Sequence, residues 1–200
     1  MGIHAQKGFT LIELIIALAI ASILVGVGVP SFFSAIKNSC TSSSYNGIVS
    51  TLVYARSEAV KSAEQVTVCP RGSDTACGND WNNGLLVFRD VVRVANEATA
   101  VVNPQDTIVA LEPALSCGNT LFNYASSDRT AADASARNFI RYAPDGSTDW
   151  QNGSFILCDE RGDEFSRSIN VVLTGDVRRG RTTAGSEIPV DVFGVQLSCP

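Results

Sequence analysis

Side chains that could perform chemistry are scarce in this 200-residue sequence. The only histidine, His4, lies close to the N-terminus, so a general base or a Ser-His-Asp triad has no imidazole in the rest of the chain. The acidic run 159–164 offers oxygen ligands of the kind Ca²⁺ prefers, but it lacks the alternating spacing of an EF-hand and contains Arg161. We expect a solvated hairpin turn there, and we expect no enzymatic activity, no metal and no cofactor.

One carboxylate stands out by its surroundings. Every residue from Phe9 to Val29 is apolar, Gly, Ala, Thr or Ser except Glu13. About 20 such residues span the hydrocarbon core of a bilayer as a helix, and a carboxylate inside it costs about 2.5–3.5 kcal/mol even on a lenient scale. A secretory signal peptide and a plain membrane anchor are alternative interpretations of the apolar run. Both leave Glu13 unexplained, because such a residue usually has a partner.

The helix that carries Glu13 is predicted to continue beyond the membrane. Gly26, Gly28 and Pro30 predict a bend or a local loss of helix where the chain would leave the bilayer. Apolar residues then recur at helical spacing between residues 48 and 63, which predicts an amphipathic half that packs on a sheet. We therefore expect a helix at 9–63 whose membrane-spanning half is 9–29, followed by a β-rich globular head at 64–200.

After Gln65 the pattern changes to short apolar runs separated by Gly, Pro, Asn and Asp. No later helical pattern is available for parallel crossovers, so the strands are expected to be antiparallel. The predicted fold class is α+β, with one long N-terminal helix laid on an antiparallel β-sheet head. The expected strands are Val66–Cys69, Gly84–Arg89, Thr107–Leu111, Leu121–Tyr124, Phe139–Tyr142, Ser154–Leu157, Ser168–Leu173 and Val190–Ser198.

The segment Lys7-Gly8-Phe9-Thr10-Leu11-Ile12-Glu13-Leu14 resembles the prepilin signature of type IV pilins and type II secretion pseudopilins. The resemblance implies that residues 1–8 are a leader, that prepilin peptidase cuts between Gly8 and Phe9, and that the new N-terminal Phe9 is N-methylated. It also implies that Glu13 is the fifth residue of the mature chain. The overall fold implied is the type IV pilin fold.

Charge pairing gives Glu13 a role. After cleavage the α-amino group of Phe9 is a cation at a helix N-terminus, where the helix dipole already places partial positive charge. The carboxylate of Glu13 could offset the charge of its own Phe9 or, in a filament, that of an incoming subunit. Removing one member of a buried ion pair costs about 3–5 kcal/mol, so Glu13 is predicted to be an assembly residue.

Fragments of the head narrow the resemblance to the GspH/FimT group, which holds the type II secretion pseudopilin GspH and the minor pilins FimT and FimU. This resemblance implies a minor pilin of a type IV pilus, near the filament tip, that helps to prime assembly. The alternative within the group is a GspH-type minor pseudopilin of type II secretion. The fragments follow in order along the chain: Tyr54-Ala55-Arg56-Ser57-Glu58-Ala59, Val66-Thr67-Val68-Cys69-Pro70, Asp80-Trp81-Asn82-Asn83-Gly84, Tyr142-Ala143-Pro144-Asp145-Gly146 and Phe155-Ile156-Leu157-Cys158-Asp159.

The partners implied are other major and minor pilins and prepilin peptidase. The implied location is the inner membrane, as a single-pass protein with a periplasmic head, before the subunit enters a pilus filament or pseudopilus.

Six cysteines lie behind the apolar segment without the paired spacing of a zinc site, which favours disulfides in an oxidising compartment. Cys69 and Cys77 enclose a short turn-rich loop and are the first expected pair. We further expect Cys158 with Cys199 and Cys40 with Cys117, although sequence alone leaves these two pairings open.

A basic cluster near the C-terminus raises the question of DNA. Some FimT proteins resembling this chain are thought to capture DNA through a Gly-Arg-x-Arg motif, where this chain has Gly175-Asp176-Val177-Arg178. Arg178, Arg179 and Arg181 could contact phosphates, but the chain has a net charge of −5 and Asp176 replaces the first arginine. A solvated hairpin, or an ion-pairing edge that docks a neighbouring pilin, is the favoured interpretation.

Overall fold

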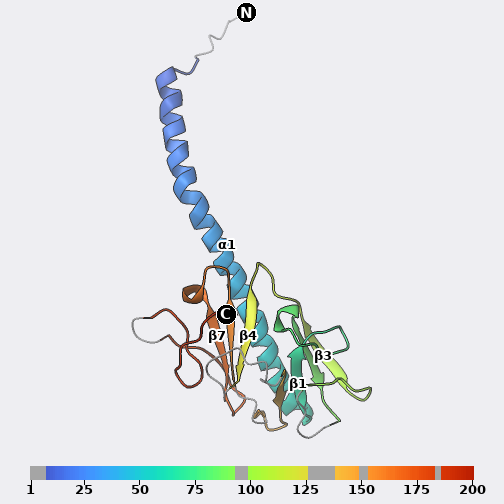
Figure 1. Ribbon diagram of the computed structural model, residues 1–200. Coiled ribbons are helices and arrows are strands. Elements are labelled where there is room, and N and C mark those ends of the chain that lie inside the picture. The colour runs from blue at the N-terminus through green and yellow to red at the C-terminus, as the bar shows by residue number, and fades with distance from the viewer. Residues whose placement is uncertain (1–7, 93–98, 126–137, 149–152, 183–185) are drawn as a thin grey trace, which may run out of the picture. The chain divides into compact units, whose positions relative to one another are not determined.

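The computed structural model describes residues 8–92, 99–125, 138–148, 153–182 and 186–200 (Figure 1). Most of the predicted leader, residues 1–7 with His4 and Lys7, lies outside this part of the chain. The chain divides into two compact units, Met1–Cys40 and Thr41–Pro200, which are described separately.

The helix α1 spans Leu11–Ser62 and contributes to both units. It begins at a Thr N-cap, because Oγ1 of Thr10 accepts a hydrogen bond of 3.3 Å from the backbone N–H of Glu13. Pro30 lies inside α1, and the helix is continuous through it. The predicted local loss of helix is therefore wrong, since proline removes only one of many backbone hydrogen bonds.

In the first unit most side chains of α1 are exposed. Leu18 is 62% exposed and Phe32 is 66% exposed. None of the most apolar window of α1 is buried, and α1 is the one described helix long and apolar enough to cross a membrane. An apolar helix without internal packing requires an apolar environment from elsewhere, either lipid or other helices.

In the second unit the same helix becomes amphipathic. Ile48, Leu52, Ala55 and Ala59 recur at helical spacing and are buried, as the sequence pattern predicted, and Tyr45, one turn before the predicted segment, is buried with them. They belong to one core cluster that also contains inward-facing residues of both sheets.

Two four-stranded antiparallel sheets make up the rest of the second unit, with orders β3-β2-β1-β5 and β4-β6-β7-β8. The bounds of the strands are β1 Val66–Pro70, β2 Leu85–Arg89, β3 Thr107–Glu112, β4 Thr120–Ala125, β5 Ile140–Tyr142, β6 Gly153–Cys158, β7 Arg167–Val171 and β8 Val177–Arg179. Short 3₁₀ helices lie at Trp81–Asn83 and Asp163–Phe165.

The inward faces of the sheets share the core with α1, because side chains alternate between the two faces of a strand. In β6, Phe155 and Leu157 belong to this core, whereas Ile156 and Cys158 lie in a second cluster with Leu197 of the C-terminal segment. The ring of Trp81 meets that of Phe155 edge to face, with centroids 4.9 Å apart. The head therefore closes on α1 and also buries part of its outer faces.

The predicted strands compare closely with the observed ones, with two differences. Seven of the expected segments are strands, but they form two sheets where the prediction had one. Val190–Ser198 is no strand, because Asp191 begins a turn that Gly194 closes with a backbone hydrogen bond of 3.2 Å. The eighth strand is instead β8, which the sequence patterns do not predict.

Candidate assembly sites

The N-terminal candidate site consists of Phe9, Thr10 and Glu13 at the start of α1. Glu13 occupies the first turn of the helix, three residues after the Thr10 cap, and Phe9 is 86% exposed. A carboxylate in the first turn is stabilised by the helix dipole. Within the described residues its side-chain oxygens accept no hydrogen bond and form no ion pair, so the carboxylate is available to a cation from outside the chain.

Arg56, from the first head fragment, joins α1 to two turns of the head. Its Nε donates to the backbone oxygen of Gly146 at 2.9 Å, and its Nη2 donates to that of Thr174 at 3.0 Å. Its Nη1 lies 2.8 Å from Oδ1 of Asp176. One guanidinium on the helix thus fixes the loop after β5 and the turn between β7 and β8.

Both turns need glycine at the point of contact. Gly146 and Gly175 have φ angles of +80° and +79°, a region that other residues seldom adopt. A Cβ on Gly175 would also collide with the backbone oxygen of Gly146. The turn at 143–147 is held by hydrogen bonds of 2.8 Å between the backbones of Ala143 and Ser147 and between those of Gly146 and Ala143.

Glu58 attaches the same helix face to the first sheet. Its carboxylate is 6% exposed and accepts hydrogen bonds from Nε and Nη2 of Arg89 in β2, at 3.0 and 2.6 Å. Ala55 and Ala59 are fully buried, which allows α1 to approach the sheets closely. The fragment 54–59 is therefore the sequence signature of helix-to-sheet docking.

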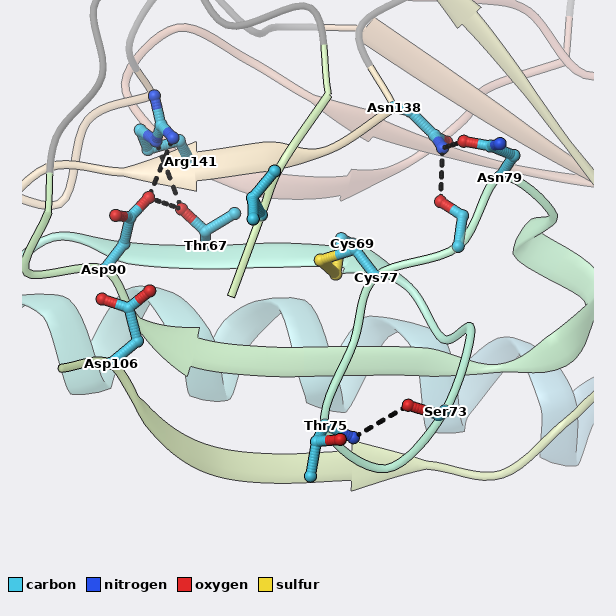
Figure 2. The surroundings of a disulfide bond; sticks show 12 residues. Thr67, Cys69, Ser73, Thr75, Cys77, Asn79, Asp90, Asp106, Asn138 and Arg141 are labelled. Carbon is cyan, nitrogen blue, oxygen red and sulfur yellow. Dashed lines mark hydrogen bonds and ion pairs between the residues drawn. A yellow bond between two sulfur atoms is a disulfide. The ribbon is translucent and has the colours of Figure 1, made fainter. Parts of the chain in front are cut away.

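On the outer face of the first sheet, an ion pair lies near the first disulfide (Figure 2). Nη2 of Arg141 in β5 lies 2.8 Å from Oδ2 of Asp90, and the two side chains are 5% and 3% exposed. Thr67 of β1 accepts from Arg141 and donates to Asp90, so the pair is tied to the strand between them. Its role is structural, because a buried pair without one partner is strongly destabilising.

The structure contains the two disulfides Cys69–Cys77 and Cys158–Cys199. Cys40 and Cys117 are also disulfide-bonded, so none of the six cysteines is free. Figure 2 shows Cys69–Cys77 closing the loop that follows β1. Cys158–Cys199 joins β6 to the last residues of the chain.

The acidic run at 159–164 forms the predicted connection between β6 and β7, but its first residue is not solvated, because the Asp159 side chain is 3% exposed and pairs with Arg161. Burial raises the pKa of Asp159, but hydrogen bonds and the positive charge of Arg161 outweigh it and hold the pKa below its ordinary value. Asp159 also accepts from Thr41 of α1, and Gly162 turns the chain with a φ of +98°. Within the described residues no group of three or more His, Cys, Asp or Glu could hold a metal.

The basic cluster lies where β8 meets the C-terminal segment. Arg178, Arg179 and Arg181 line one pocket, together with residues of β7 and of the segment 190–194. Nη2 of Arg178 lies 3.4 Å from Oδ2 of Asp176, which also contacts Arg56. Hydrogen bonding from Arg178, together with the charge of Arg56, keeps the pKa of Asp176 below its ordinary value.

Arg179 also affects the helix. Burial raises the pKa of Tyr45 in α1, while the charges of Arg179 and Arg167 oppose the increase. The guanidinium of Arg167 lies 5.9 Å from the centre of the Tyr45 ring. Arg179 therefore lines the pocket and also lies close enough to Tyr45 for its charge to influence that pKa.

Comparisons with known proteins identify the family of the chain. The family model for the type II transport protein GspH matches residues 45–176, and the prokaryotic N-terminal methylation motif matches residues 3–29. The comparison with curated protein sequences found no match.

Two solved structures are similar to this chain. The type IV minor pilin FimU of Pseudomonas aeruginosa has 16% identity and a TM-score of 0.49, with 72% of this chain and 90% of that chain covered. The minor pseudopilin EpsH from the type 2 secretion system of Vibrio cholerae has 11% identity and a TM-score of 0.44, with 74% and 99% covered.

A methylation motif opening an apolar helix, followed by a GspH-type head, defines a type IV pilin-like subunit anchored by a single membrane span. The chain belongs to the GspH family, whose model covers most of the head. Within this class it is a minor pilin or pseudopilin.

In the sequence, Arg56 and Glu58 are recognisable only as parts of a motif, and nothing there indicates their partners Asp176 and Arg89. Asp90 and Arg141 were missed entirely. Their signal in the sequence is weak, because an isolated charge in a strand is usually solvated.

Proposed function

We propose that this protein is a minor pilin of a type IV pilus, of the FimU/FimT kind, which enters the filament near its tip and helps to prime assembly. It acts as a structural subunit without catalysis. The carrying observation is α1, whose first half is apolar and without internal packing, and whose first turn carries one unpaired carboxylate within the described residues. The ordered head fragments resemble the GspH/FimT group as a whole, and the choice of the pilus within that group is part of the proposal.

Processing at Gly8-Phe9 would place a methylated ammonium group one turn before Glu13. In the inner membrane, the mature subunit would hold its head in the periplasm. On entering the filament, its Phe9 ammonium would pair with Glu13 of a neighbouring pilin, or its Glu13 with the neighbour's ammonium. Pairing relieves two charges together while the apolar helices pack.

Replacing Glu13 by Ala tests this proposal. We expect E13A to be inserted and cleaved normally but to be absent from sheared filaments, because an unpaired buried charge costs about 3–5 kcal/mol. The matched control is T10A, which removes the N-cap at a cost of about 1 kcal/mol and keeps the carboxylate. Quantitative immunoblots of membranes and filaments give both readings. Normal filament levels of E13A would refute the pairing role.

The second candidate is a minor pseudopilin of type II secretion, favoured by the family model, which is that of GspH. Deletion of the gene separates the two functions. Loss of pili and of twitching, with secretion intact, supports the pilus, whereas loss of exoprotein secretion with intact pili supports the pseudopilus.

A further inference from the structure

The pocket beside β8 has features that helix-to-sheet docking does not explain. Its volume is about 300 Å³, at the lower end of the range for ligand sites. One side is the outer face of β7 and β8, with Asn170, Val172 and Arg178, and the other is the C-terminal segment from Val190 to Gly194. The pocket is large enough for a side chain with its own backbone, and too small for a folded element.

Two arginines of the pocket, Arg178 and Arg181, form few interactions within the described chain. Arg178 is 65% exposed, and its 3.4 Å contact with Asp176 is long for a charge-assisted hydrogen bond. Arg181 is exposed and forms no ion pair with another described residue. The carboxylate of Asp191 is occupied by its own turn, since Oδ1 accepts from the backbones of Phe193 and Val195 at 2.8 Å. Two guanidinium groups therefore remain able to bind an anion.

A buried polar group in the pocket wall lacks a partner. Asn170 is only 7% exposed, and its Nδ2 donates to the backbone oxygen of Val190 at 3.2 Å. This bond fixes the amide orientation, and Oδ1 then accepts no hydrogen bond. A buried acceptor such as Oδ1 that receives no hydrogen bond costs free energy. Arg178 stands opposite Asn170 in the strand ladder, and both residues line the pocket.

We infer that this pocket binds an acidic side chain, Asp or Glu, presented on a loop of a neighbouring pilin-like subunit. The carboxylate pairs with Arg178 and Arg181, whose planar guanidinium groups match its two oxygens. The backbone N–H of the same residue donates to Oδ1 of Asn170. Val172, Val190 and Val192, which also line the pocket, add apolar contacts of the kind common at interfaces.

The surrounding charge favours a single carboxylate over a nucleic acid. The chain carries a net charge of −5, and Asp176 and Asp191 lie beside the arginines. An extended polyanion would meet these carboxylates, whereas one acidic side chain fits between the guanidinium groups. The choice of a neighbouring subunit as the source of the carboxylate rests on the proposed function; the binding chemistry does not.

The test uses the full chain in detergent micelles and two peptide probes, acetyl-Gly-Asp-Gly-amide and acetyl-Gly-Asn-Gly-amide. Saturable NMR shifts of the Asn170 side-chain amide and the Arg178 Nε–H are expected with the Asp peptide, at an affinity at least tenfold tighter than with the Asn peptide. R178Q should weaken binding about tenfold, because it removes a charge-assisted pair. N170D should abolish it, since it places a like charge beside the ligand.

K61Q is the matched control, because it removes one cation far from the pocket on α1 and should leave the affinity unchanged. Equal weakening by K61Q and R178Q, or no saturable shift, would overturn the inference. So would tighter binding of a 12-nucleotide DNA that R178Q abolishes, since this would identify the ligand as phosphate.

The source of the carboxylate is tested by assembly. N170D should lower filament incorporation at least fivefold while leader cleavage stays normal. Normal incorporation of N170D, despite peptide binding to the wild type, would refute a neighbouring subunit as the source. If the wild type itself enters no filament, the proposed function fails, and the peptide titration still reports on the pocket.

Discussion

The two parts of α1, residues 11–40 and 41–62, belong to one continuous helix but differ in what surrounds their apolar residues. Before Thr41, Leu18 is 62% exposed and the helix packs against nothing else within its unit. After it, Leu52 is 1% exposed and lies in a core shared with both sheets. The second part buries its apolar side chains in the core of the head. The first part can bury them only in lipid or against neighbouring subunits.

The charged residues follow the same division. Within the described chain, the carboxylate of Glu13 is unpaired, whereas Glu58 and Asp90 each have an arginine partner. The difference separates two kinds of charged residue: internal pairs stabilise the head, whereas the unpaired carboxylate in the first turn is the one that we propose serves assembly.

The largest expected effect concerns the buried ion pair of the head. R141L should lower the free energy of unfolding by about 3–5 kcal/mol, because it leaves Asp90 charged and buried. Urea denaturation of the full chain in detergent measures this loss. The double variant D90N/R141L should recover part of it, and leader cleavage should be unaffected in both. A loss below about 1 kcal/mol for R141L would show that the pair is solvated.

A matched pair of leucines tests the comparison within one helix. L52A should cost about 2–5 kcal/mol of head stability, because it opens a cavity in the core. L18A should change the same denaturation curve by less than about 0.5 kcal/mol, since its side chain is exposed outside the head. Similar losses for both variants would contradict the division of α1 into two units.

Two glycines with similar backbone angles give the next comparison. G175A combines a positive φ with a clash against the backbone of Gly146, which would also disturb the hydrogen bond from Arg56. We expect it to cost clearly more than the roughly 1–2 kcal/mol of backbone strain alone. G162A, with φ +98° and open space around it, should show only that strain. Equal midpoints in urea for the two variants would argue against the Arg56 connection.

The smallest effect is a pH dependence at Asp159. Its pKa in the folded state is below the ordinary 3.8, so its contribution to stability is complete above about pH 5. The contribution is lost as the pH falls below 3.8 through the lowered pKa, because the unfolded state then binds the proton first. D159N should flatten the decline of the melting temperature between pH 5 and pH 3. D74N, at a carboxylate that is 80% exposed, should leave the slope unchanged.

Much of the fold follows from local patterns in the sequence. The spacing of apolar residues predicted both halves of the helix and seven strands, because helical and alternating periods are properties of short segments. β8 was not predicted because its residues, Val177–Arg179, are mostly charged. It is a strand because its backbone pairs with β7, which its composition does not indicate. The prediction of a strand at Val190–Ser198 was wrong because Asp191 and Gly194 form a turn that interrupts the apolar pattern.

The sites divide in the same way. The Gly8-Phe9 junction and Glu13 are contiguous in sequence, so a motif can reveal them. The pairing of Asp90 with Arg141 joins residues 51 positions apart, and the pairing of Arg56 with Asp176 joins residues still further apart in the sequence. Such contacts depend on the register of two sheets, which local patterns do not determine.

Mass spectrometry of the mature N-terminus tests the central claim most directly. The protein purified from membranes of cells with an active prepilin peptidase is predicted to begin at Phe9 and to carry one methyl group on its α-amino nitrogen. In cells without the peptidase, the chain should keep residues 1–8. An N-terminus at Met1 in both strains, or a cut after residues 19–21, would contradict the account, because the charge that Glu13 is proposed to pair with would not exist.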